Sequence, residues 1–307
     1  MTTIPVKNPA IPASAWWLAT LPPLFWSGNF LFARAMRDAI PPFQMSFWRW
    51  VVALLILLPF CLPPIKAQWP RIRANLPFLA FLGLIGVTAF NCFVYAALHH
   101  TTVVNGALVN SLLPIATFLL AFLILKQRLS PRQILGVAIS LAGAAVVIAR
   151  GDLAALRGFS PNRGDLLVLV GMSFWALYTV LIRWRPLGLD PMALLGVTVA
   201  FGVLFHLPLV AWEYQARGGF ALTPANAGAI LYFAIFPSIL AYIFWNRSVA
   251  VLGPGRTGMF MHLLPIFSAV LATVFLGERL APYHALGFAL VVAGIAIVTR
   301  PQAAKPA

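Results

Sequence analysis

The sequence predicts an all-α integral membrane protein of ten transmembrane helices, arranged as two inverted five-helix repeats. Three observations lead to this fold class: an apolar composition, ten apolar runs of spanning length, and an internal repeat with five runs in each copy. Of the 307 residues, 62% are hydrophobic and only 9% are charged. A water-soluble domain carries about 25% charged residues, so hydrocarbon is the expected solvent of this chain.

The charge pattern fits a membrane protein better than a nucleic-acid-binding one. Lys and Arg total 21 against 6 Asp and Glu, a formal net charge of +15. The basic residues stand singly between apolar runs, so the lipid bilayer explains them and no nucleic-acid partner is expected. Cys61 and Cys92 each lie inside an apolar run, without metal-ligand spacing or a disulfide pattern. We expect both thiols to be reduced and buried, and no metal or other cofactor.

A helix needs roughly 20 mostly apolar residues to cross the hydrocarbon core. The first run could be mistaken for a secretory signal, but it is long enough to span and shows no small-residue cleavage site before Arg34, so a retained helix is expected. Turn-forming pairs such as Pro63-Pro64 and Gly253-Pro254 separate the runs. The ten predicted spans lie near residues 15–35, 43–62, 76–97, 103–125, 132–149, 166–184, 192–212, 227–248, 257–276 and 284–299.

The distribution of Lys and Arg between the connections predicts the orientation. With a cytoplasmic N-terminus, the inner connections and termini hold thirteen basic residues and the outer connections hold seven, with Arg49 inside a span. Cytoplasmic loops carry the excess of Lys and Arg. Both termini are therefore expected in the cytoplasm.

An internal repeat divides the chain into two related domains, 15–150 and 164–300. A shift of 151 residues aligns Leu112-Leu113-Pro114-Ile115 with Leu263-Leu264-Pro265-Ile266, and thirteen of the thirty positions from Pro114 to Gly143 are identical. Pro, Arg and Gly match in register, which chance similarity between Leu/Ala-rich helices does not explain. Because each copy has five spans, the second copy must enter the membrane upside down.

Inverted repeats are typical of secondary transporters, because two interchangeable halves can open a central site alternately to either side. The sequence therefore predicts transport by alternating access through a central cavity between the two repeats. A single chain contains both halves, so a monomer suffices.

Several short motifs carry a family resemblance. They are Trp26-Ser27-Gly28-Asn29-Phe30 with Arg34, Arg49 early in the second span, and the run Leu-Leu-Pro to Gly-Glu-Arg-Leu-x-Pro at 263–282. This pattern resembles the EamA family of the drug/metabolite transporter superfamily over about residues 16–300. The resemblance implies ten helices and export of metabolites. Within the family the chain is most similar to YddG-type aromatic amino acid exporters of the bacterial inner membrane, which implies aromatic or other large neutral amino acids as cargo.

Polar groups within a bilayer are costly unless protein or cavity water satisfies them, so they are candidates for a substrate site. Asn91 and Tyr95 lie four residues apart in the third span, as do Tyr242 and Asn246 in the eighth, and each pair shares a helix face. Under a two-fold axis these four side chains would meet near the middle. Bonding between neighbouring helices is the alternative role.

The remaining candidates come from four other spans. Trp26 and Asn29 share a face in the first span, as do Trp175 and Tyr178 in the sixth, and aromatic rings there could stack on a flat apolar cargo or simply face lipid. The fourth and ninth spans carry further polar groups and prolines that could bend the helices for gating or merely kink them. These residues are Asn110, His262, Pro114 and Pro265.

Arg49 lies about seven residues into the second span. It could attract a carboxylate, or it could cap carbonyls or extend to the outer interface. We favour the structural role, capping carbonyls or extending to the interface, because the family resemblance places an Arg here whatever the cargo.

The acidic residues suggest how transport is coupled. All six are predicted at or beyond span ends, so no carboxylate is expected near the midplane: Asp38, Asp152, Asp165, Asp190, Glu213 and Glu278. Proton- or sodium-coupled transporters usually place such a group within the membrane. We expect facilitated diffusion or exchange instead. His262 could titrate, although a neutral hydrogen-bonding role is expected for a single histidine in a membrane.

Three alternatives to amino acid export remain. A broad exporter of drugs or cationic dyes belongs to the same class but would normally need a buried acid. An intramembrane enzyme would need a nucleophile with a base or a metal set, and the only local pair, His99-His100, has no acid nearby; no enzyme activity is expected. A structural or signalling protein would not explain two inverted halves.

Overall fold

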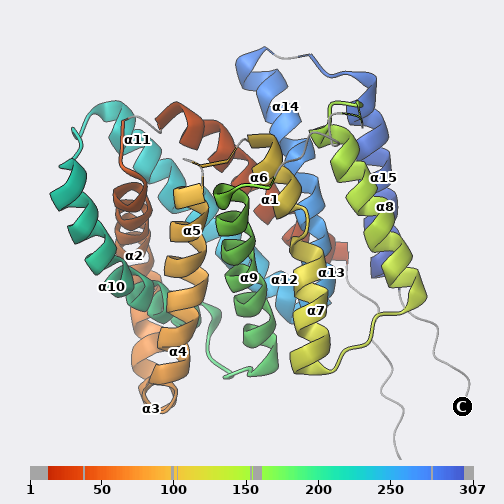
Figure 1. Cartoon of the computed structure of the whole chain (residues 1–307). Helices are drawn as coiled ribbons and strands as arrows, with labels where there is room; N and C mark the ends of the chain where they lie inside the picture. The colour runs from red at the N-terminus through yellow and green to blue at the C-terminus, as the bar shows by residue number, and fades with distance from the viewer. Residues whose placement is uncertain are drawn as a thin grey trace, which may run out of the picture.

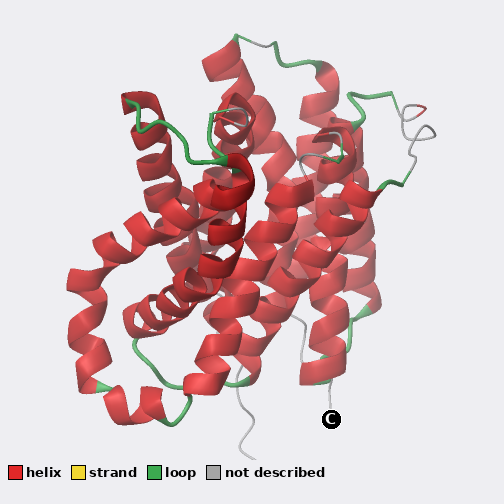
Figure 2. Ribbon diagram, turned by 60° about the vertical axis from the view of Figure 1, so that its left-hand side comes forward, coloured by secondary structure: helices red, strands yellow, loops and turns green. Residues whose placement is uncertain are grey.

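The computed structural model describes residues 13–36, 39–97, 100–101, 103–152, 154, 161–277 and 279–300. This part of the chain is helical and contains no strand (Figure 2). The helices are α1 (Ala13–Met36), α2 (Pro42–Ala67), α3 (Trp69–Arg73), α4 (Leu76–Gly83), η1 (Leu84–Ala89), α5 (Phe90–Ala97), α6 (Val103–Asn110), α7 (Leu113–Leu125), α8 (Pro131–Ile148), α9 (Arg163–Trp184), α10 (Pro191–Arg217), α11 (Pro224–Phe233), η3 (Ala234–Leu240), α12 (Ala241–Leu252), α13 (Pro254–Met259), η4 (Phe260–Leu263), α14 (Leu264–Leu276) and α15 (Pro282–Thr299).

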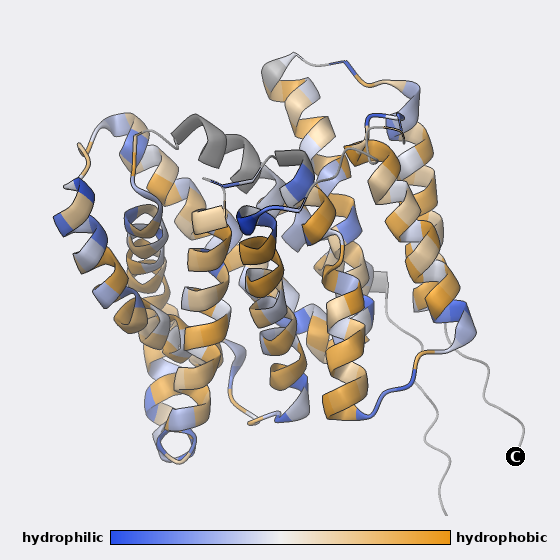
Figure 3. Cartoon of the chain, in the orientation of Figure 1, coloured by the Kyte–Doolittle hydropathy of each residue, from blue (hydrophilic) through white to orange (hydrophobic). Residues whose placement is uncertain are grey.

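Nine helical runs in the described residues are long and apolar enough to cross a membrane. Each overlaps one of the predicted spans, so nine of the ten are confirmed as apolar helical runs of spanning length. The tenth, near 15–35, falls within α1, which is 24 residues long but is not among the nine. Many large apolar side chains on these runs are exposed, including Leu55, Phe60 and Phe275. Figure 3 shows hydrophobic residues along the helices and hydrophilic ones mostly near their ends, as expected for a lipid-facing surface.

The break predicted at Pro63-Pro64 is wrong. Helix α2 continues through both prolines and ends at Ala67. Each proline removes one N–H donor, but these two lie in the last turns, where the helix is leaving the apolar region, and the Pro64 carbonyl still accepts from the Gln68 amide at 3.0 Å. The helix therefore ends one turn later than the sequence predicts.

Four of the membrane-crossing runs are not continuous α-helices. The run Leu76–Ala97 contains the π-helical segment η1, and the run Pro224–Leu252 contains the π-helical segment η3. Pro114 and Pro265 stand at the second position of α7 and α14, just after a turn at 111–112 and the 3₁₀ segment η4. Proline is well tolerated in the first turn of a helix because those N–H groups have no intrahelical acceptor. Each proline therefore begins a new helical segment.

Helices α8 and α15 form a pair at one edge of the molecule (Figure 1). Glycines bring the two backbones together. A Cβ atom on Gly143 would lie 2.7 Å from the Gly287 carbonyl oxygen, and one on Gly136 would lie 2.8 Å from the Gly294 carbonyl oxygen. Only glycine fits this approach, as in other small-residue helix contacts in membranes.

Candidate substrate site

The two π-helical segments place backbone carbonyls in the middle of the molecule. A π segment shifts the hydrogen-bond ladder of a helix and is frequent at functional sites. Tyr242 Oη donates to the Gly86 carbonyl of η1 at 2.6 Å, and Trp26 Nε1 donates to the Pro237 carbonyl of η3 at 2.9 Å. In both cases an aromatic side chain from one half of the chain satisfies a π segment of the other half.

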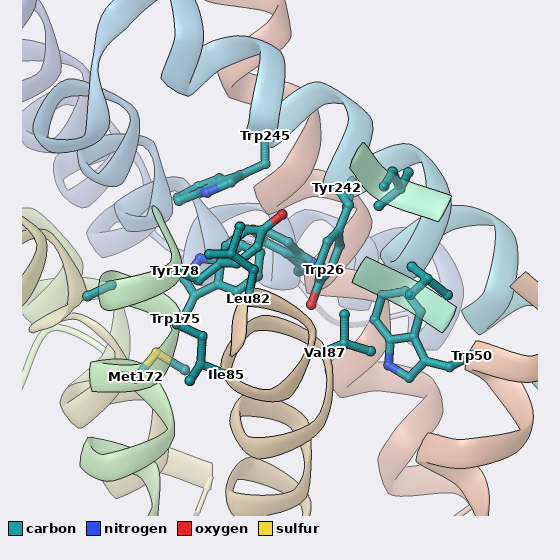
Figure 4. Close-up of a cluster of buried hydrophobic side chains, with 14 of the residues drawn as sticks. Trp26, Trp50, Leu82, Ile85, Val87, Met172, Trp175, Tyr178, Tyr242 and Trp245 are labelled. Atoms are coloured by element: carbon teal, nitrogen blue, oxygen red, sulfur yellow. The ribbon is translucent and has the colours of Figure 1, made fainter. Parts of the chain in front are cut away.

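Trp26 and Tyr242 belong to a group of six aromatic side chains whose rings contact one another (Figure 4). The Trp175 ring stacks on Tyr178, with centroids 5.2 Å apart, and meets Tyr242 edge-on at 4.9 Å. Edge-to-face and offset pairs are the favourable geometries for such rings. We call this set the central aromatic cluster: Trp26, Trp50, Trp175, Tyr178, Tyr242 and Trp245.

The central aromatic cluster is closed to solvent. Except for Trp26 at 8%, none of its side chains is more than 1% exposed. Two pockets lined by described residues lie elsewhere, one of about 910 Å³ between α2, α10 and α11 and one of about 350 Å³ between α14 and α15. A solute can therefore reach these rings only when the helices move apart.

Arg49 lies beside the central aromatic cluster, and its contacts differ from the two that a structural role predicts, carbonyl capping or extension to the interface. The side chain is 2% exposed, so it does not extend to the interface. Its described hydrogen bonds go to side chains and not to backbone carbonyls: Nη1 donates to Tyr95 Oη at 3.0 Å, and Nη2 donates to Asn91 Oδ1. The guanidinium carbon lies 5.2 Å from the centre of the Trp50 ring. Among the described residues, no carboxylate pairs with it.

The structure brings together seven of the side chains predicted from the sequence. Asn91 and Tyr95 bind Arg49, and Tyr178 Oη donates to Asn246 Oδ1 at 3.1 Å. Of the two predicted Asn/Tyr pairs, Asn91 and Tyr95 therefore lie beside Tyr242, whose hydroxyl also interacts with the Asn91 side chain, while Asn246 bonds to Tyr178. The seven are Trp26, Asn91, Tyr95, Trp175, Tyr178, Tyr242 and Asn246.

Three predicted residues do not join this site in the described contacts. His262 is fully buried, with Nε2 bonded to the Ser111 carbonyl at 2.9 Å and Nδ1 bonded to Ser140 Oγ at 2.7 Å. Because a carbonyl only accepts, Nε2 carries the proton and the ring serves as a bridge between segments. Asn110 is buried at the end of α6, next to this bridge. The side chain of Asn29 lies outside the described residues.

Sequence reasoning missed Trp50 and Trp245 and discounted Arg49. Trp50 follows Arg49 directly, and Trp245 lies three residues after Tyr242, so each shares a helix region with a candidate residue. Helical spacing could have identified Trp245, because residues three apart share a face. No local pattern shows that Arg49 would face Asn91 and Tyr95 from another helix.

One acidic residue departs from its predicted position. Glu213 lies inside α10, four residues before its end, and is 1% exposed. Its Oε2 accepts from the Gln44 backbone N–H at 2.8 Å, in the first turn of α2. A carboxylate is stabilised by the unpaired N–H groups of a helix N-terminus. Glu213 therefore lies inside α10 and not at or beyond its end. Its buried carboxylate joins α10 to α2.

Comparison with known proteins identifies the family. The EamA-like transporter family matches residues 13–149 and 162–300. The chain belongs to this family. Its multiple apolar helices and this membership make it a multi-pass membrane protein of a transporter family.

Relatives of this family member are named as transporters. It is 28% identical over 273 residues to the uncharacterized transporter YyaM of Bacillus subtilis, covering 89% of each chain. It is 28% identical over 289 residues to a probable terminal-alkyne amino-acid exporter of Streptantibioticus cattleyicolor, covering 94% of each chain. A protein of known crystal structure, 21% identical, shares the fold with a TM-score of 0.74 over 94% of this chain and 96% of that one.

Proposed function

We propose that this protein is a secondary transporter that exports aromatic or other large neutral amino acids by alternating access. The observation that carries the proposal is the central aromatic cluster, in which side chains of both halves bind π segments of the opposite half. Movement of one half against the other would break and remake these contacts. A buried site between two halves is where such transporters hold their substrate.

The proposal includes ten spans in two inverted five-helix domains, 15–150 and 164–300, with α1 as the tenth span. The two matched segments, 13–149 and 162–300, support this division. The pair α8 and α15 supports inversion, because Gly136 faces Gly294 while Gly143 faces Gly287. At the repeat shift of 151, Gly136 is equivalent to Gly287 and Gly143 to Gly294. Reciprocal contacts of this kind are those that a two-fold axis generates.

The choice of cargo rests on chemistry and on one relative. Aromatic rings in a buried site can stack on a flat or apolar side chain. The similarity to a probable amino-acid exporter, over 94% of each chain, favours amino acids. Cationic dyes, the alternative cargo, are disfavoured because the buried guanidinium of Arg49 would repel them.

Counterflow with purified protein in liposomes tests this function. Vesicles loaded with unlabelled cargo would take up labelled tryptophan and phenylalanine, while threonine would exchange more weakly and a cationic dye would not exchange. Robust dye flux without aromatic amino acid flux would favour the drug exporter instead.

A variant series tests whether the named side chains line the path. Alanine at Asn91, Tyr95, Tyr242 or Asn246 is expected to lower flux, while alanine at the exposed Gln127 should leave it unchanged. Unchanged flux in all four folded variants would assign them to helix packing only.

We place this transporter in the bacterial inner membrane as a monomer with both termini cytoplasmic, and with its cargo and the bilayer as its only partners. The excess of thirteen basic residues over seven supports the orientation. Labelling of single cysteines placed near each terminus, in right-side-out vesicles, tests it. Ends on opposite sides of the membrane would contradict the inverted arrangement.

A further inference from the structure

We propose that Arg49, with the indole N–H groups of Trp50 and Trp175, forms a receptor for the carboxylate of the transported solute, and that recognition does not require an ammonium group. The proposal rests on the transport function above and names its substrate class: monocarboxylates with an aromatic or large apolar body, amino acids included.

No carboxylate of the described residues pairs with the buried guanidinium of Arg49. Its two recorded hydrogen bonds go to the neutral side chains Tyr95 and Asn91, and its Nε–H has no acceptor. A buried ion left without a partner is costly. A carboxylate is the group that a guanidinium binds best, because its two oxygens match parallel N–H donors. A solute carboxylate would therefore supply the missing charge and the missing acceptor together.

The four indoles of the central aromatic cluster divide into those whose N–H has an acceptor and those whose N–H has none. Trp26 and Trp245 donate to protein acceptors, the Pro237 carbonyl and Thr179 Oγ1. Trp50 and Trp175 are at most 1% exposed, and neither Nε1–H has an acceptor. Buried donors are almost always satisfied, so an exception calls for an explanation.

The side chains that carry the unsatisfied donors are linked by a chain of ring contacts. The Arg49 guanidinium lies over the Trp50 ring, Trp50 contacts Tyr242 at 4.9 Å, and Tyr242 contacts Trp175 at 4.9 Å. Tyr242 is thus flanked by both unsatisfied indoles. Three N–H groups without acceptors in one contiguous cluster indicate a ligand that brings acceptor oxygens and few donors.

Among the described residues, no acid forms a hydrogen bond with a side chain of this cluster. Each described carboxylate is engaged elsewhere: Asp152 at Ala154, Asp165 at Thr101 and Asn162, Asp190 at the start of α10, and Glu213 at Gln44. The charge of the site is therefore complementary to a carboxylate alone. An acid that lacks the ammonium group should bind as well as the amino acid.

Competition against counterflow of labelled phenylalanine tests the chemistry. The competitors are 3-phenylpropanoate, which keeps the carboxylate, and phenylalaninamide, which keeps the ammonium. We expect 3-phenylpropanoate to inhibit about as strongly as phenylalanine, and phenylalaninamide to inhibit about tenfold more weakly or worse, the loss expected for one charged hydrogen bond. Equal inhibition by the amide would overturn the proposal and leave the transport function standing.

An isosteric variant tests the role of Arg49 without removing it. Asn91→Asp places a permanent carboxylate on the Arg49 Nη2 contact, with nearly unchanged shape. The variant should fold and should bind 3-phenylpropanoate about tenfold more weakly or worse, because the guanidinium is already neutralised. Undiminished binding of 3-phenylpropanoate would contradict the assignment of Arg49.

Three indole variants form a matched set. Trp50→Phe and Trp175→Phe remove N–H groups without acceptors and keep an aromatic ring. Both variants should therefore show a smaller preference for 3-phenylpropanoate over phenylalaninamide than the wild type. Trp212→Phe removes the N–H of an exposed indole outside the cluster, so its preference for 3-phenylpropanoate over phenylalaninamide should match that of the wild type. The same ratio in all three variants would remove the indoles from the receptor.

Direct binding separates failure of the receptor from failure of transport. Thermal stabilisation of the detergent-solubilised wild type by 3-phenylpropanoate, absent in Asn91→Asp, would support the carboxylate site even if no solute crosses the liposome membrane. In that outcome only the transport proposal would fall.

Discussion

The His262 ring donates its Nε2–H to the Ser111 carbonyl at 2.9 Å, and the two residues lie 151 positions apart. That separation equals the shift that aligns the two halves of the chain. Two positions that the sequence repeat makes equivalent therefore touch each other directly, as the proposed two-fold axis requires of residues that lie on it. Because Nδ1 also contacts Ser140 Oγ, the one ring connects η4 to α8 and to the turn before α7.

Replacing His262 by Leu should destabilise the protein by about 2–3 kcal/mol, because the Ser111 carbonyl and the Ser140 hydroxyl would lose their partner in a buried position. Thermal unfolding in detergent measures this loss. His100→Leu is the control, since His100 is exposed and should change stability by less than about 0.5 kcal/mol. Equal effects from both variants would mean that the bridge contributes nothing.

The α8–α15 pair yields a second prediction. A Cβ on Gly294 would lie 2.6 Å from Ser140 Cβ and 2.7 Å from the Ser140 amide nitrogen, and backbone atoms cannot rotate away. Gly294→Ala should therefore destabilise the protein by about 1–3 kcal/mol. Urea or thermal unfolding with a fluorescence readout would measure it.

Gly228→Ala is the matched control for this pair. Gly228 lies in α11, and a Cβ there would meet nothing within 4 Å. Alanine should be neutral or stabilise by up to about 1 kcal/mol, because it is the better helix former. A gain in stability from Gly294→Ala, or a loss of stability in Gly228→Ala alone, would contradict close packing of α8 on α15.

Hydropathy and spacing were enough to predict most of the fold. Nine predicted spans coincide with helical runs, because the length of an apolar run is dictated by the thickness of the hydrocarbon core. The pairs Asn91–Tyr95 and Trp175–Tyr178 could be assigned to shared helix faces because helix periodicity depends only on the local sequence.

Features that depend on tertiary contacts could not be predicted. The π segments around Gly86 and Pro237 change the helix period by less than hydropathy can detect, and their carbonyls are satisfied by Tyr242 and Trp26 from other spans. Arg49 has a sequence position compatible with the interface. Its burial follows from the placement of Asn91 and Tyr95 on another run.

Glu213 provides a test of coupling. Although buried, it accepts a backbone N–H of α2, so we predict that it fixes the end of α10 and carries no transported proton. Glu213→Gln keeps an acceptor oxygen of the same shape, so it should retain flux and its response to a pH gradient, at a stability cost of about 1 kcal/mol or less. Proteoliposome flux with and without an imposed gradient measures this. Loss of gradient-driven flux in the folded variant would identify a carboxylate relay.

The Tyr242 hydroxyl yields the last prediction, because it joins one half of the chain to the π segment of the other. Tyr242→Phe keeps the ring that packs between Trp50 and Trp175 but leaves the Gly86 carbonyl without its donor. We expect a loss of about 1–2 kcal/mol in stability, together with a changed exchange rate, since the contact must break when the halves move. Tyr214→Phe, at a side chain that is 61% exposed, is the control for removing a hydroxyl. If Tyr242→Phe lowers stability but leaves counterflow unaltered, the bond to the Gly86 carbonyl serves folding only. The η1 segment would then take no part in the transport cycle.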